Sequence, residues 1–160
     1  MLNIKTFCFN ILQENTYVVS DDTRECVIID CGAYYDAERN ALVDYINSNN
    51  LKPVHLLATH GHFDHNFGIN IVYDTWGLKP EIAAEDEWLI SDLPGQFYAM
   101  AGIKLRCQYP KPDHFFAPTR SSALAPTSCR YFALQAIRLV ALPFIARKRK
   151  WPLLATRCSA

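Results

Sequence analysis

The chain has 160 residues, of which half are apolar and 12% aromatic, and its 16 basic residues balance its 16 acidic ones. This composition excludes a wholly disordered chain, a collagen-like repeat and a pure coiled coil, and the length suits one domain with its own core. No run of about 20 apolar residues predicts a membrane span, and the N-terminus lacks the apolar stretch of a signal peptide. We therefore expect a cytoplasmic protein with no membrane partner.

The balanced charge hides two different compositions. Residues 1–117 hold all 16 acidic residues and 8 basic ones, a net charge of 8 − 16 = −8, whereas residues 118–160 hold the other 8 basic residues and no acidic one. The last glycine is Gly102. This change predicts a domain over residues 1–117 and an aberrant basic tail over residues 118–160.

The domain alternates strand and helix patterns. Runs rich in β-branched, aromatic and other apolar residues predict strands over residues 4–9, 15–20, 25–30, 54–58 and 81–84. Helices are predicted from a cap at Asp36 to Asn49, over 67–76 and over 85–90. The first three strands suggest an antiparallel meander, and the strand after the first helix favours a β-α-β unit in a mixed sheet. Residues 94–117 contain several prolines and are expected to form a long, partly irregular connection.

The chemistry is concentrated in Thr59-His-Gly-His-Phe-Asp-His65, directly after a buried strand. Neutral imidazole and carboxylate are common ligands of zinc and related cations. His60 and His62 are two residues apart and can point the same way, whereas Asp64 and His65 follow a turn and can face a second ion. Gly61 permits backbone dihedrals that other residues avoid. A pair of ions roughly 3.5–4 Å apart lowers the pKa of water to near neutrality, which suits attack on a carbonyl or thioester.

Other interpretations of the polar residues stay open. The cluster can instead be a histidine-rich loop in which Asp64 caps a helix that begins near Asn66. Asp30, at the end of a strand, either orients a ligand histidine or forms a turn. His55 is interpreted as a packed or hydrogen-bonded strand residue, and His114 as an exposed residue of the connection. The six cysteines form no C-x-x-C pair and are interpreted as thiols.

The segment from Thr59 to His65 resembles the H-x-H-x-D-H signature of the metallo-β-lactamase superfamily, and residues 15–19 and 27–32 resemble its opening strands. The small glyoxalase-II-like hydrolases are the most similar branch. The resemblance implies an α/β fold, with residues 1–117 as the N-terminal half of an αββα sandwich.

The resemblance also implies a site and an activity. It assigns His60 and His62 to a first metal ion and Asp64 and His65 to a second, with Asp64 also steering the attacking water as the catalytic residue. One or two zinc ions are implied, with iron or manganese as alternatives. The implied substrate is a small-molecule thioester such as an acyl-glutathione; lactones, β-lactams and phosphodiesters stay open.

The tail departs from the family pattern. The family also has T-P-G-H-[ST]-x-G-S and G-D-x-L-F segments, but no histidine follows His114 and no aspartate follows Asp113. Shifting the reading frame by one base recovers T-P-G-H-S-P-G-S from residues 133–141 and A-I-T-G-D-A-L-F from residues 152–159. We therefore interpret residues 119–160 as an out-of-frame translation, which the gene sequence around codon 118 would test. The basic run 147–150 is then no nucleic-acid site, and the alternative is a truncated, catalytically inactive member with partial metal binding.

Overall fold

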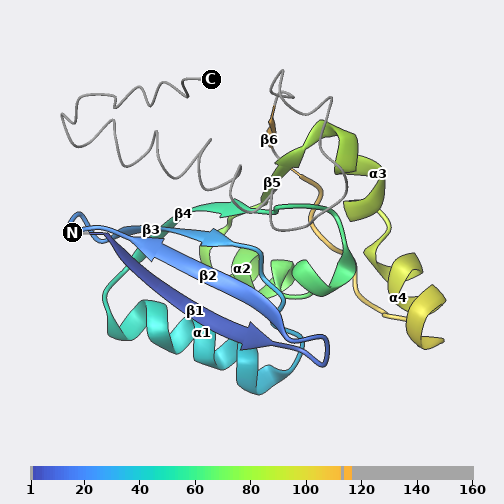
Figure 1. Cartoon of the computed structure of the whole chain (residues 1–160), viewed down its shortest axis with the longest axis horizontal. Helices are drawn as coiled ribbons and strands as arrows, with labels where there is room; N and C mark the ends of the chain where they lie inside the picture. The colour runs from blue at the N-terminus through green and yellow to red at the C-terminus, as the bar shows by residue number, and fades with distance from the viewer. Residues whose placement is uncertain (1, 113, 117–160) are drawn as a thin grey trace, which may run out of the picture.

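The computed structural model describes residues 2–112 and 114–116, and the tail predicted over residues 118–160 lies outside them. The described residues form a single six-stranded sheet with the strands in chain order (Figure 1). The strands are β1 Asn3–Phe9, β2 Glu14–Ser20, β3 Glu25–Ile29, β4 Lys52–Leu57, β5 Pro80–Ala83 and β6 His114–Phe116.

The sheet is mixed, as the pattern of strands and helices predicted. Strands β1, β2 and β3 are antiparallel and place Tyr17 opposite Ile29. Strands β3 to β6 run parallel, with Ile28 beside Leu56, because α1 carries the chain back between β3 and β4. The carboxyl ends of β3 and β4 therefore meet at one edge of the sheet, and residues that follow these two strands come close together.

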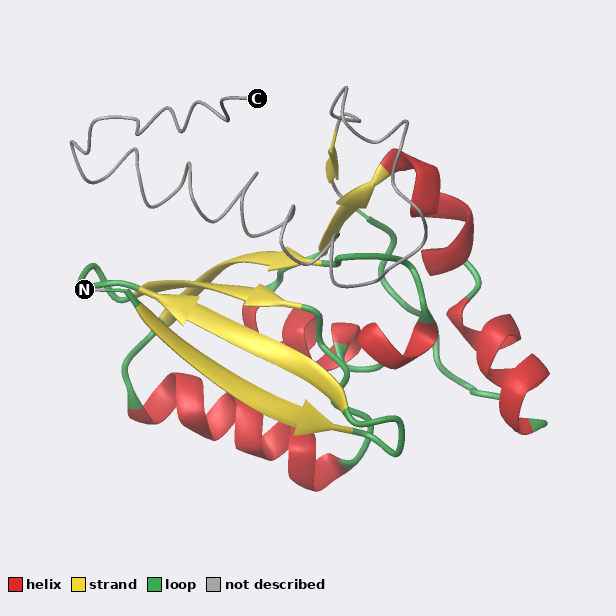
Figure 2. Cartoon of the chain, viewed as in Figure 1, coloured by secondary structure: helices red, strands yellow, loops and turns green. Residues whose placement is uncertain are grey.

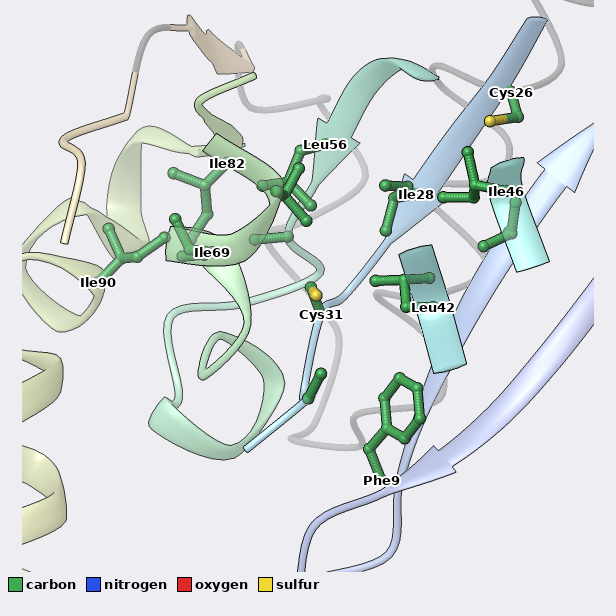
Figure 3. Close-up of a cluster of buried hydrophobic side chains, with 14 of the residues drawn as sticks. Phe9, Cys26, Ile28, Cys31, Leu42, Ile46, Leu56, Ile69, Ile82 and Ile90 are labelled. Carbon is green, nitrogen blue, oxygen red and sulfur yellow. The ribbon is translucent and has the colours of Figure 1, made fainter. Parts of the chain in front are cut away.

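Helices cover one face of the sheet (Figure 2). The helical segments are α1 Asp36–Ser48, η1 Phe63–His65, α2 Ile69–Trp76, η2 Ala84–Asp86, α3 Glu87–Ile90 and α4 Leu93–Ala101. Leu42 and Ile46 of α1 and Ile69 of α2 are buried in the same cluster as Ile28 and Leu56 of the sheet (Figure 3). This cluster fixes the two helices, and hence the loop between β4 and α2, against the strand ends.

Alternate residues of the central strands face the other way. A second cluster contains Val19, Val27, Ile29 and Leu57, all buried, with Tyr17 packed against it. Both faces of β3 and β4 are thus apolar, which is the pattern of strands in the middle of an α/β sheet. The α/β class predicted from the sequence is confirmed.

Within the described residues, the partly irregular connection expected over residues 94–117 is irregular only in its middle, since it begins in helix α4 and its residues 114–116 form strand β6. The carboxylate of Asp92 accepts a hydrogen bond from the Gly95 amide at 3.1 Å, and Pro94 lies in the first turn, where a missing amide hydrogen costs nothing. Gly102 ends the helix with φ +68°. A proline in the first turn starts a helix as readily as it breaks one.

The cap of α1 is also displaced by one residue from the prediction. Tyr35 is the N-cap, and Asp36 lies in the first turn. The carboxylate of Glu38 accepts the amides of Tyr34 and Tyr35 at 2.9 and 3.1 Å. The amides of Glu38 and Arg39, which a cap at Asp36 would have accepted, donate instead to the Tyr35 carbonyl, both at 3.0 Å.

In the described part of the chain, none of the helices combines the length and apolarity that a bilayer-spanning segment requires. The four cysteines described there carry thiols: Cys8, Cys26, Cys31 and Cys107. Burial raises the pKa of Cys26 and Cys31 to about 12, so these two thiols act as small apolar side chains.

Candidate metal centre

Asp30 organises the edge where β3 and β4 end. Its amide donates to the Leu57 carbonyl at 2.8 Å, and its φ of +50° turns the side chain toward the segment after β4. One carboxylate oxygen accepts the Thr59 amide at 2.7 Å, and the other lies 2.8 Å from the Thr59 hydroxyl and 3.1 Å from His65 Nδ1. Of the two interpretations left open by the sequence, the structure supports Asp30 as the residue that orients a histidine.

Pairwise contacts link the four predicted ligands along the turn after β4. The ring centroids of His60 and His62 are 4.6 Å apart, and those of His60 and His65 are 4.2 Å apart. Asp64 Oδ2 lies 3.6 Å from His65 Nε2. The helix after this loop begins at Ile69, so Asp64 does not cap it; the N-cap is Gly68.

Thr59 connects the first histidine to the same carboxylate. Its hydroxyl lies 2.9 Å from His60 Nδ1 and 2.8 Å from Asp30 Oδ2. A hydroxyl has one hydrogen to donate, so when it donates to the carboxylate it accepts from His60 Nδ1. Asp30 thereby holds His60 through Thr59, and His65 directly, in the tautomer whose Nε2 carries no proton. An unprotonated Nε2 is what a cation requires.

The electrostatics of the two histidines differ. Burial, reinforced by the charge of His65, lowers the pKa of His60 to about 4, so this imidazole is neutral at pH 7. Burial also opposes the charged form of His65, but the hydrogen bond and charge of Asp30, together with nearby Asp64 and Glu14, outweigh it and raise the pKa. Two nitrogen donors beside several carboxylates form a donor set that suits a divalent cation.

Glu14 is a site residue that the sequence did not reveal. It begins β2, and its side chain is fully buried. Its Oε1 lies 3.7 Å from His65 Nδ1, and Glu14, Asp30 and His65 can each offer a ligand atom within 4.8 Å of the others. Burial, and then the charge of Asp30, raise the pKa of Glu14 to about 8. A glutamate at the start of a strand that holds no other charged residue was the available signal.

Side-chain amides hold the backbone of the turn after β4, residues 59–65. Asn66 Nδ2 donates to the carbonyls of His60 and His62 at 3.0 and 2.7 Å. Gln96 of α4 donates to the Gly61 carbonyl at 3.1 Å, so three successive carbonyls of the turn are bound. Asn10 Nδ2 donates to the Asp64 carbonyl at 2.9 Å. The backbone of this turn is therefore held by three side chains whose role was not predicted from the sequence: Asn10, Asn66 and Gln96.

The role predicted for Gly61 needs correction. Its φ does not lie in the left-handed region, which among the glycines of the described chain holds Gly77 and Gly102. A Cβ atom at position 61 would instead lie 2.5 Å from Leu89 Cβ and 2.8 Å from the Ile90 amide nitrogen. Glycine is needed here because α3 approaches the turn closely, not because of an unusual dihedral.

The remaining histidines lie elsewhere on the sheet. His55 Nδ1 contacts Glu81 Oε1 at 2.5 Å, and His114 Nδ1 lies 3.2 Å from Glu81 Oε2. The side chain of His114 is 64% exposed. The interpretations of His55 as a hydrogen-bonded strand residue and of His114 as an exposed one are both confirmed.

Comparison with known families agrees with this geometry. Residues 10–125 match the model of the metallo-beta-lactamase superfamily. The chain belongs to this superfamily, and the resemblance carried by the histidine motif is confirmed for the N-terminal part of the chain.

Three known proteins illustrate the similarity. Hydroxyacylglutathione hydrolase GloC of Haemophilus influenzae is 33% identical over 104 residues, which are 59% of this chain and 43% of GloC. The crystal structure of BLEG-1 B3 metallo-beta-lactamase superposes with a TM-score of 0.64 at 26% identity, covering 74% of this chain and 55% of BLEG-1. That of TTHA1623 in a di-iron-bound form gives 0.56 at 25% identity, covering 76% and 56%. The chain thus spans about half the length, or less, of these proteins.

Proposed function

We propose that the protein is a metal-dependent hydrolase that acts on a small-molecule thioester such as an acyl-glutathione. One observation carries the proposal: His60, His62, Asp64 and His65 converge at the carboxyl edge of the sheet, where Asp30 orients two of the imidazoles. The thioester rests on the likeness to GloC, whose name specifies hydroxyacylglutathione hydrolysis.

In this proposal His60 and His62 would hold a first cation, and Asp64 and His65 a second. The donors suit zinc; iron and manganese are alternatives, and the similar TTHA1623 was solved in a di-iron-bound form. Such cations polarise the substrate carbonyl and lower the pKa of the attacking water.

The protein's own residues prepare that step. Asp30 and Thr59 keep the imidazoles in the tautomer that presents Nε2. The carboxylate of Asp64, 21% exposed, is the proposed catalytic residue, because it can reach solvent and orient the attacking water. A cytoplasmic location is part of the proposal, and the thiol state of the described cysteines is the one that a reducing compartment maintains.

A second candidate function concerns this chain by itself. No histidine follows His114 and no aspartate follows Asp113, so the motif supplies four ligands divided between two cations. Catalytic zinc sites usually have three protein ligands for each ion. We therefore propose, as the alternative, that the 160-residue chain binds metal partially and is catalytically inactive.

The experiment combines metal analysis with an activity assay. The purified chain is loaded with zinc, its metal content is measured, and hydrolysis of S-lactoylglutathione is followed with and without a chelator. Turnover that a chelator abolishes supports the hydrolase, whereas bound zinc without turnover supports the inactive alternative. A chain that retains no more zinc than a variant with His60 and His62 both changed to alanine would contradict both.

A further inference from the structure

Glu14 makes an incomplete set of hydrogen bonds for a buried carboxylate. Its Oε2 lies 2.8 Å from the Thr16 hydroxyl, which in turn accepts the Gly32 amide at 3.0 Å. Its Oε1 is buried and has no hydrogen-bond partner among the described residues. Removing a carboxylate from water is costly unless both oxygens find compensation. A positive charge near Oε1 would provide this compensation.

The group that faces Oε1 is the imidazole of His65. Glu14 Oε1 lies 3.7 Å from His65 Nδ1, on the side of the ring away from Asp64. Asp30 already accepts this nitrogen at 3.1 Å and is enough to fix its tautomer. Two buried carboxyl groups therefore flank one ring nitrogen, although Asp30 alone is enough to orient it.

Packing alone gives an incomplete account of this acidic side chain. A Cβ atom at Gly32 would lie 2.1 Å from Glu14 Oε2, so the side chain fills space against the end of β3. A glutamine would fill the same space and accept the same hydrogen bond from Thr16 without the cost of burying an ionisable group. The acidic group itself is thus what needs a function.

We propose that Glu14 is a positioning residue that acts through His65 and strengthens its hold on a cation. A negative charge behind Nδ1 draws the Nδ1–H bond outward and makes Nε2 a better electron donor, as carboxylates behind metal-bound histidines do in general. A cation on Nε2 makes the ring more positive and compensates Glu14 and Asp30 in return. This inference rests on the proposed metal site. It attributes part of the site's affinity for a cation to Glu14, which is not one of the four proposed ligands.

The test separates the acidic group of Glu14 from its shape. Glu14→Gln keeps the shape and removes the acidic group, and Glu14→Asp keeps the acidic group but shortens the side chain. Asp44→Asn, on the exposed side of α1, is the matched control for replacing a carboxyl group by an amide. Cobalt(II) titration, read from the visible absorption of the bound ion, measures cation affinity, and thermal unfolding of the metal-free chain measures stability.

Glu14→Gln should weaken cobalt binding about tenfold, at the lower end of the range for residues behind metal ligands, while raising the melting temperature of the metal-free chain. Glu14→Asp should retain most of the affinity, and Asp44→Asn should change neither quantity. A purely structural residue would lower affinity and stability together. That result, or affinity unchanged in Glu14→Gln, would overturn the proposal.

Two further outcomes of this test also have a defined meaning. If Glu14→Gln does not fold, the proposal stands or falls on whether Glu14→Asp retains the affinity. If the unaltered chain binds no cobalt, the proposed metal site fails, and the role of Glu14 fails with it. This failure appears before any variant is compared, so it is distinct from a failure of the Glu14 proposal alone.

Discussion

Asn66 is the residue whose loss should most directly loosen the turn after β4. Its side chain is 1% exposed and donates from one amide nitrogen to the carbonyls of His60 and His62. Asn66→Ala removes both hydrogen bonds without placing a new group in the turn. Two carbonyl oxygens would then lack these donors, one of them in a buried contact and the other in a partly buried one.

The expected magnitude follows from these two contacts. A buried carbonyl that loses its donor costs about 1–3 kcal/mol, and a partly buried one that water can reach costs about 1 kcal/mol or less. Asn66→Ala should therefore lower the free energy of unfolding by about 1–4 kcal/mol. Asn66→Asp should cost more, because a carboxylate oxygen would replace the donor and face two carbonyl oxygens.

Urea unfolding of the metal-free chain, followed by far-ultraviolet circular dichroism, measures these changes. Asn40→Ala on the exposed surface of α1 is the control, and it should be neutral or slightly stabilising because alanine favours helix. A loss below about 1 kcal/mol in Asn66→Ala would show that water replaces the amide in both contacts, and it would refute the view that Asn66 fixes the turn.

Three further predictions concern the surroundings of the site. Gly61→Ala should lower the free energy of unfolding by about 1–3 kcal/mol and weaken zinc binding, because the added methyl group collides with Leu89; urea unfolding and zinc titration measure both effects. The hydrogen bond to Glu81 raises the pKa of His55, so this pair stabilises the fold below pH 6.5, and the stabilisation is lost as the pH rises through the raised pKa. Glu81→Gln should therefore lower the free energy of unfolding more in mild acid than in mild alkali. Equal losses at both pH values would contradict this. Because burial raises the pKa of Glu14 from 4.5 to about 8, stability should fall as the pH rises through this interval, and melting temperatures of Glu14→Gln should lack that fall.

Much of the fold and of the ligand set could be predicted because the signals are local. Continuous runs of apolar and β-branched residues identified the central strands. The four candidate ligands lie within six consecutive residues, so their proximity needs only one turn. Glu14 and Gln96 could not be found in this way. Glu14 contacts a histidine 51 positions later, and Gln96 binds a carbonyl 35 positions earlier, so only the packed sheet and helices bring them to the site. The short strand β6 pairs with β5 across a similar separation.

Asp30 shows why this edge of the sheet concentrates chemistry. A left-handed backbone at a residue other than glycine costs about 1 kcal/mol, although aspartate tolerates it better than most. The hydrogen bond from its amide to Leu57 and the two donated by Thr59 offset that cost, and they are formed only when β3 and β4 lie side by side. The same carboxylate orients the imidazoles of His60 and His65, which we assign to different cations. The contacts that pair β3 with β4 therefore also place the Asp30 carboxylate beside both imidazoles. Folding of the strand pair thus prepares both proposed cation sites.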